Sequence, residues 1–137
     1  MATYTHPRAA TGASIKAVHA GVNSETAEYS FSNTMSSGDI VNMFKVPAGA
    51  VVTDVVTRFT SITGLVVQFG VGDDGSSERY NASISATGVS RATAGIPYSY
   101  SATGTIRCTV SGVGSLCTGG TIRVTVYYKM DDPLITN

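Results

Sequence analysis

The sequence predicts an all-β protein, a single-domain antiparallel β-sandwich of jelly-roll type with an extended N-terminal arm. Apolar residues recur at every second position over long stretches, which is the period of a strand with one buried face. Strand-forming residues are abundant, and no apolar stripe of helical period occurs. Turn-forming residues separate short apolar segments at spacings of roughly eight to twelve residues, which is typical of a two-sheet sandwich. The sequence has no Trp for an immunoglobulin-type core, so a jelly roll is favoured.

The first twelve residues are expected to form the arm, and residues 13–137 the sandwich. The arm contains Pro7 and Gly12 and shows little alternation, so we expect it to lie apart from the sandwich. A first strand is expected around residues 15–22. A chain of 137 residues with 42% hydrophobic residues is long enough to form one domain with its own core.

Rows of alternating apolar residues predict the remaining strands, about nine in all. The clearest strand spans residues 121–129, with one apolar and one polar face. Between two of the strands, Pro47 and Gly49 suit the second and fourth positions of a type I turn. The expected inward rows are Tyr29 and Phe31; Ile40, Phe44 and Val46; Val51, Val55 and Phe59; Leu65, Val67, Phe69 and Val71; Tyr80, Ala82 and Ile84; Ile96, Tyr98 and Tyr100; Ile106, Cys108 and Val110; and Ile122, Val124, Val126 and Tyr128.

The charge distribution argues against two classes of partner. Nine basic residues balance nine acidic ones and are scattered singly, whereas a nucleic-acid-binding protein is expected to show a basic excess. No apolar run approaches the length of a membrane span, and the N-terminus lacks the apolar core of a signal peptide. We therefore expect neither nucleic acid nor membrane as a partner. A surface rich in small polar residues suits contact with another protein.

No catalytic, metal or cofactor site is predicted. His6 and His19 have no second ligand at metal-site spacing, and a nucleophile-elbow motif is missing. The acidic stretch from Asp73 to Glu78 lacks the spacing of a calcium-binding loop, so a solvated turn is favoured over a metal site.

Four carboxylates, Asp39, Asp54, Asp73 and Glu78, are compatible with a convergent pair of the glycosidase type. The lack of Trp to stack on sugar rings disfavours a carbohydrate-active enzyme, and we expect no enzymatic activity. Two alternatives stay open for the cysteines. Cys108 and Cys117 are either reduced thiols, which is the favoured reading, or a small disulfide across one loop.

A partner interface is predicted at two places. Tyr127 lies on the polar face of the strand at residues 121–129, and Tyr supplies a large contact area at low entropic cost. An ordinary half-exposed strand tyrosine is an equal alternative at that position. The arm contributes the other candidates, which are Tyr4, His6, Pro7 and Arg8.

Residues 38–55, which predict a strand, a Val-Pro-Ala-Gly turn and a second strand, resemble small phage structural proteins of the capsid-decoration (cement) type. The resemblance continues in residues 71–74, 78–80 and 121–128. It implies a jelly-roll protein, often trimeric, that binds the major capsid protein on the outside of the virion after assembly in the host cytoplasm. The alternatives are another virion component, such as a head fibre, tail or receptor-binding module, or a carbohydrate-binding domain.

Overall fold

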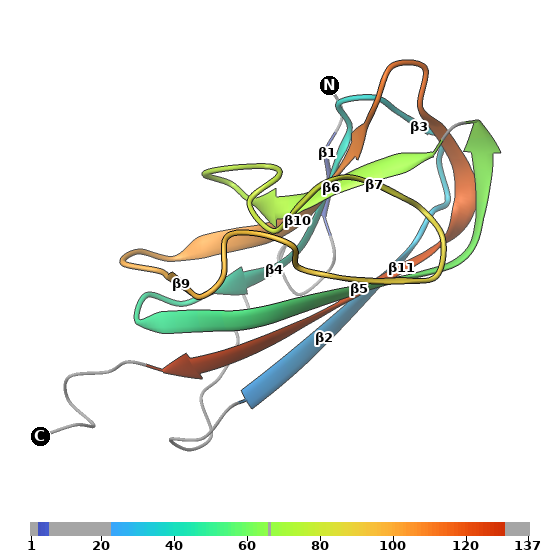
Figure 1. Cartoon of the computed structure of the whole chain (residues 1–137). Helices are drawn as coiled ribbons and strands as arrows, with labels where there is room; N and C mark the ends of the chain where they lie inside the picture. The colour runs from blue at the N-terminus through green and yellow to red at the C-terminus, as the bar shows by residue number, and fades with distance from the viewer. Residues whose placement is uncertain (1–2, 6–22, 66, 131–137) are drawn as a thin grey trace, which may run out of the picture.

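The computed structural model describes residues 3–5, 23–65 and 67–130, which form two β-sheets packed face to face and contain no helix (Figure 1). Sheet A contains, in spatial order, β1 (Thr3–Thr5), β4 (Ile40–Val46), β10 (Gly104–Ser111), β6 (Gln68–Asp73) and β7 (Asn81–Ser85). Sheet B contains β2 (Asn23–Ser30), β11 (Leu116–Met130), β5 (Ala50–Leu65) and β8 (Val89–Arg91). Two short strands join sheet B, because β3 (Met35–Ser36) pairs with β11 and β9 (Tyr98–Ser99) pairs with β5.

The strand pairing is that of a jelly roll. Four antiparallel pairs are nested from the outside of the chain inward: β2 with β11, β4 with β10, β5 with β8, and β6 with β7. The nested pairs together form one long hairpin. The hairpin is folded over so that β11 also pairs with β5, and β10 with β6, which completes the two sheets. The predicted fold class is confirmed. In the described part of the chain, no helix is long and apolar enough to cross a membrane.

One part of the predicted arm belongs to the sandwich. Residues Thr3–Thr5 form β1, which pairs in parallel with β4 at the edge of sheet A, with Tyr4 opposite Val41. The expectation that this segment lies apart from the sandwich is therefore wrong for these three residues, because backbone pairing needs no alternation of side chains. Residues 6–12 and the strand expected at residues 15–22 lie outside the described residues.

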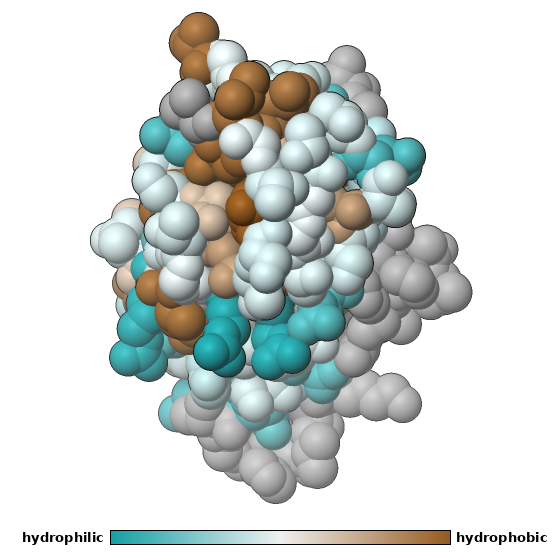
Figure 2. Space-filling view, turned by 90° about the vertical axis from the view of Figure 1, so that its right-hand side faces the viewer, coloured by the Kyte–Doolittle hydropathy of each residue, from teal (hydrophilic) through white to brown (hydrophobic). Residues whose placement is uncertain are grey.

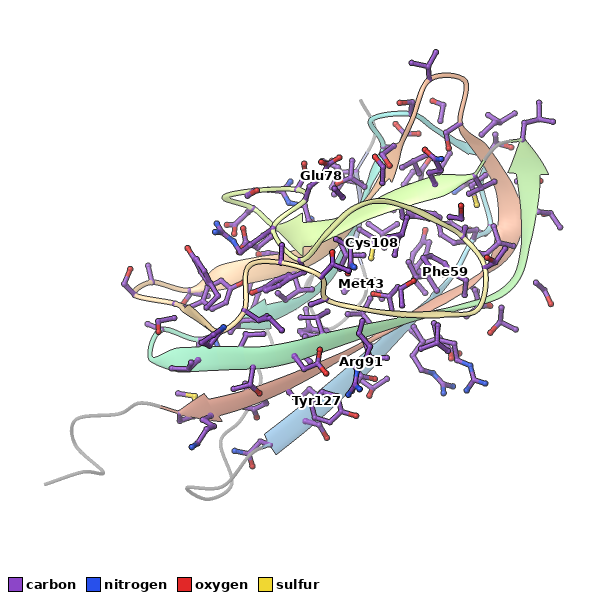
Figure 3. The ribbon with its side chains drawn as sticks, in the orientation of Figure 1. Met43, Phe59, Glu78, Arg91, Cys108 and Tyr127 are labelled. Carbon is purple, nitrogen blue, oxygen red and sulfur yellow. The ribbon has the colours of Figure 1, made fainter. Side chains whose placement is uncertain are left out.

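The core fills the space between the sheets. The inward rows predicted for β10 and β11 are fully buried, from Ile106 to Val110 and from Ile122 to Tyr128. Phe69 stacks between Phe31 and Phe59, with ring centroids 5.8 and 5.5 Å apart. Figure 3 shows Met43, Phe59 and Cys108 between the two sheets.

Three inward rows are wrong in part, each where the strand is interrupted. Leu65 is 63% exposed because β5 ends there and the chain crosses to sheet A before Phe69. Ala82 is exposed, and Asn81 is buried in its place, because the register between β6 and β7 shifts. Val51 is only half-buried, since a register shift between β5 and β11 turns Val52 inward. Of the strand expected at residues 96–100, Tyr98–Ser99 forms β9, and Tyr100 continues it with backbone hydrogen bonds to Gly49 and Ala50.

The turn between β4 and β5 differs from its prediction. The N–H of Ala50 donates to the carbonyl of Pro47, so Gly49 occupies the third position with φ of 91°. A positive φ at this position is the mark of a type II turn, and glycine adopts it without strain. The expected type I turn had Pro47 at the second position and Gly49 at the fourth. Both residues therefore lie one position earlier in the turn than predicted.

Candidate partner-contact surfaces

The outer face of sheet B is a broad surface built from alternate residues of β2, β11, β5 and β8. Strand alternation brings one side chain from each strand into a row, since the strands are paired in register. The four rows, in strand order, are Ser24, Tyr127 and Asp54; Thr26, Thr125, Val56 and Arg91; Glu28, Arg123, Arg58 and Val89; and Ser30, Thr121 and Thr60.

Most polar groups on this face are paired with one another. The hydroxyls of Thr26 and Thr125 are 2.8 Å apart, as expected for directly opposed threonines. Both Nε and Nη2 of Arg123 donate to Glu28 Oε2, at 2.9 and 2.8 Å. Nε and Nη2 of Arg91 likewise contact Oδ2 of Asp54, at 3.1 and 2.9 Å. These exposed ion pairs each contribute little to stability, but they use both carboxylates of the four rows.

Arg58 is the charged residue of these rows that has no carboxylate partner among the described residues. It lies directly opposite Arg123 in the register of β5 and β11. The two arginines line a shallow hollow of about 180 Å³ together with Val56, Val89 and Thr125. Val89 is 57% exposed. The hollow therefore combines exposed apolar surface with a guanidinium that has no carboxylate partner in the described part of the chain.

A second surface lies at one end of the sandwich. Val113, in the connection from β10 to β11, is fully exposed, and Leu65 at the end of β5 is 63% exposed. Leu65 pairs with Leu116, the first residue of β11 after the connection that carries Val113. Leu65 and Val113 therefore lie at the same end of the molecule. Figure 2 views the molecule from this end and shows hydrophobic side chains gathered in its upper part.

A polar cluster centred on Asp73 is buried at the C-terminal end of β6. Asp73 is 2% exposed and its carboxylate accepts four hydrogen bonds. Oδ1 accepts from the N–H groups of Gly75 and Ser76, both at 2.9 Å. Oδ2 accepts from Nε of Arg79 at 2.6 Å and from the hydroxyl of Tyr100 at 2.7 Å. Every acceptor position of this carboxylate is therefore used within the chain.

Two tyrosines extend this cluster. Since Tyr100 donates its proton to Asp73, the hydroxyl of Tyr80, 2.7 Å away, donates to Tyr100. The guanidinium of Arg79 covers the ring of Tyr98 at 3.9 Å from the centroid. A hollow of about 160 Å³ borders the cluster. Arg79 therefore occupies one face of Tyr98 beside this hollow.

The cluster shifts the pKa values of its members. Burial acts to raise the pKa of Asp73, but hydrogen bonds from Arg79, Tyr100 and Ser76 outweigh it, so this pKa lies below its ordinary value. Burial raises the pKa of Tyr80 to about 12. Burial also raises the pKa of Tyr100, and its hydrogen bonds to Tyr80 and Asp73 act in the same direction. At neutral pH the cluster thus contains an ionised Asp73 and two neutral tyrosines.

The predicted interface residues are distributed over different parts of the molecule. Tyr127 lies half-buried on the outer face of sheet B, as its strand pattern predicts, and Figure 3 shows it on the side away from sheet A. Tyr4 belongs to sheet A and packs partly against the core. His6, Pro7 and Arg8 lie outside the described residues. Arg58 and Val89 were missed, although Arg58 follows the alternation of the polar positions in β5.

The four candidate carboxylates do not form one site. Asp54 is bound to Arg91 on sheet B, whereas Asp73 is enclosed by its own loop at the end of sheet A. Glu78 accepts from Ser83 at 3.4 Å and lies on the outer side of sheet A in Figure 3. Asp39 accepts from the N–H of Ser36. Among the residues that the structure describes, no group of three or more His, Cys, Asp or Glu is placed to hold a metal ion.

The two cysteines are buried and free. Cys108 lies on β10 in sheet A and Cys117 on β11 in sheet B. The structure therefore has the reduced thiols that the sequence favoured.

Comparison with known proteins gives structural similarity only. No protein-family model matches the sequence, and no curated protein matches it. A chain in the capsid of Ralstonia phage GP4 superposes with a TM-score of 0.73 at 18% identity, covering 96% of this chain and 99% of its own. A chain in the capsid asymmetric unit of cyanophage Pam1 gives 0.65 at 22% identity, covering 85% and 92%. A chain in the acidic stable capsid structure of Helicobacter pylori bacteriophage KHP30 gives 0.58 at 14% identity, covering 80% and 89%.

These three similarities show a shared fold. They cover 80–96% of this chain and 89–99% of the similar chains, so the shared sandwich makes up most of each.

Proposed function

We propose that this chain is a phage structural protein that decorates the outside of a capsid and stabilises it by binding capsid subunits. The observation that carries the proposal is the nearly complete superposition on small chains from three phage capsid structures. A chain of this size that occurs as a whole in a capsid has its function in assembly with other capsid components. Fold similarity alone does not fix a function, so the surfaces of this chain must also suit the role.

The surfaces support an assembly role. The outer face of sheet B is broad, largely neutral and rich in Ser and Thr. Its hydrogen bonds and ion pairs are mostly made within the face, so covering it leaves few polar groups without a partner. The end with Leu65 and Val113 provides exposed apolar area that contact with a partner would bury.

The proposal includes the oligomer and its place. The chain forms a homotrimer, binds the major capsid protein, and sits on the capsid surface of a virion assembled in the host cytoplasm. Three copies bound to one particle through weak individual contacts gain affinity through avidity. Tyr127 and the arm residues Tyr4, His6, Pro7 and Arg8 are proposed interface residues. The role needs no catalytic, metal or cofactor chemistry.

Two measurements on the purified protein test this function. Light scattering is expected to give three times the chain mass of 14.1 kDa. Sedimentation with capsids that lack the protein is expected to bring it into the pellet in a fixed ratio to the capsid subunit. A monomer that stays in the supernatant would contradict the proposal and favour a tail, fibre or sugar-binding role.

A further inference from the structure

We propose that the outer face of sheet B is the surface that contacts the capsid subunit, and that the hollow at Arg58 receives an acidic side chain of that subunit. This inference rests on the proposed function and deepens it. It commits to one face of the sandwich and to the chemistry of one partner group.

The charges on this face carry the argument. The four rows contain three arginines and two carboxylates, and each carboxylate is already held by one arginine. Arg58 is left with Arg123 as its direct cross-strand neighbour. Like charges placed directly opposite each other disfavour the isolated sheet. Arg123 is already paired with Glu28, so among the described residues Arg58 carries the uncompensated positive charge of these rows. A carboxylate bound beside Arg58 offsets that charge, so the face is complementary to an added negative charge.

The shape of the hollow agrees with this occupant. Val56 and Val89 line it beside the two guanidinium groups, and Thr125 adds a hydroxyl. An Asp or Glu side chain has a short aliphatic stem that packs on valine and a planar carboxylate that fits the fork of an arginine. Val89 is 57% exposed and would be covered by the same contact.

One strand of sheet A is closed to such a contact. The loop between β6 and β7 folds back over its outer side, where a Cβ on Gly72 would overlap the carbonyl oxygen of Ser76. The outer side of β6 is therefore already covered by the chain itself. Lys45 on β4 is a cation of sheet A and serves as a matched control, because its replacement makes the same change in charge on the other sheet.

The first experiment compares R58E, R58A and K45E with the wild type in quantitative sedimentation with capsids that lack the protein. We expect R58E to weaken binding by roughly tenfold or more and R58A by less, because R58E places a carboxylate against the partner's own. We expect K45E to bind like the wild type. Thermal melting should show that R58E is folded and at least as stable as the wild type, since it relieves the repulsion with Arg123.

A second variant identifies the partner group. R58K places an amine in the hollow, and a carbodiimide joins amines to carboxylates that touch them. Mass spectrometry of the cross-linked particle is expected to find position 58 joined to an Asp or Glu of the capsid protein.

The outcomes separate the two proposals. If the wild type binds capsids but R58E binds equally well, or if K45E alone loses binding, the contact face is wrong and the proposed function stands. A cross-link from position 58 to a second copy of this chain would also overturn the inference, because the face would then belong to the oligomer. If the wild type does not bind capsids, both proposals fail.

Discussion

At the scale of single residues, the buried carboxylate of Asp73 links separate segments at one end of the sandwich. It joins its own loop, through Gly75, Ser76 and Arg79, to the segment that carries Tyr100. A buried carboxylate that accepts four hydrogen bonds is stable only while all its donors are in place. The cluster therefore acts as a structural connection between these segments. The same hydrogen bonds hold the pKa of Asp73 below its ordinary value.

Replacing Asp73 with Asn is expected to lower the free energy of unfolding at pH 7 by about 3 kcal/mol, because it leaves Arg79 without its buried counter-charge. The folded-state pKa of Asp73 lies below the ordinary value of 3.8, so its contribution is present above that value and is lost as the pH falls further. Urea unfolding at pH 7 and pH 3 measures this. The difference between D73N and the wild type should shrink at pH 3, and an equal difference at both values would contradict the account.

A matched control is Tyr80→Phe, which removes the last hydroxyl of the same cluster and no charge. It is expected to cost about 1 kcal/mol, with the same value at both pH values.

The cysteines give a second prediction at this scale. Cys108 is fully buried, and burial raises the pKa of its thiol to about 12. Burial also raises the pKa of Cys117, against a smaller opposite effect of a backbone hydrogen bond with Gly119. Since the thiolate is the reactive form, neither cysteine should react with iodoacetamide at pH 8 in the folded protein.

Mass spectrometry after alkylation tests this, with protein unfolded in guanidinium as the positive control. Two adducts on the unfolded chain and none on the folded chain are expected. Rapid labelling of Cys108 without unfolding would show that β10 is not buried as described.

At the scale of elements, the jelly-roll pairing makes the first strand an addition to an already complete sandwich. The four nested pairs involve β2 and later strands, whereas β1, among the described strands, lies at the edge of sheet A and pairs with β4 alone. Its three residues cover the edge of β4 from Ile40 to Asn42.

Deleting residues 1–12 is expected to leave a cooperatively folded sandwich that melts several degrees lower, because β4 loses its parallel neighbour and Tyr4 no longer packs on the core. The same deletion should weaken capsid binding, since it removes four of the proposed interface residues. Circular dichroism and sedimentation with capsids measure the two effects.

The point variant Y4A separates the effects of this deletion, since it removes the packing of Tyr4 and keeps the rest of the arm. If the truncated protein melts lower but binds capsids as well as the full chain, the arm has no role in binding.

The sequence predicted the strands best where alternation runs without interruption. Every inward residue of β10 and β11 in the predicted rows is buried, since one strand with one buried face has a period of two throughout. The errors at Leu65, Ala82 and Val51 fall at a strand end or at a register shift. Such shifts are set by the partner strand, which the local pattern does not contain.

The candidate surface was predictable only in part. Alternation placed Tyr127 on the outer face, because that property depends on its own strand. The importance of Arg58 depends on Arg123 and Glu28, which come from two other strands. Their pairing is a consequence of the complete fold, and no local signal in residues 50–65 reveals that Arg58 has no carboxylate partner among the residues described.

At the scale of the whole molecule, the two sheets differ in what they offer a partner. In sheet A the outer side of β6 is covered by the loop that follows it, whereas sheet B presents four rows of mostly small side chains with Arg58, which has no carboxylate partner among the described residues. Net charge is zero, so long-range attraction does not select the partner. Selection then depends on short-range fit and on individual charge contacts, as at Arg58.

Electron cryo-microscopy of capsids reconstituted with the purified protein tests the central claim most directly. The account predicts jelly-roll density on the outside of the shell, with sheet B facing the capsid subunits and Arg58 within hydrogen-bonding distance of an acidic side chain. Capsids without this density under saturating protein would contradict the decoration role. Density oriented with sheet A toward the shell would uphold the role and contradict the assigned contact face.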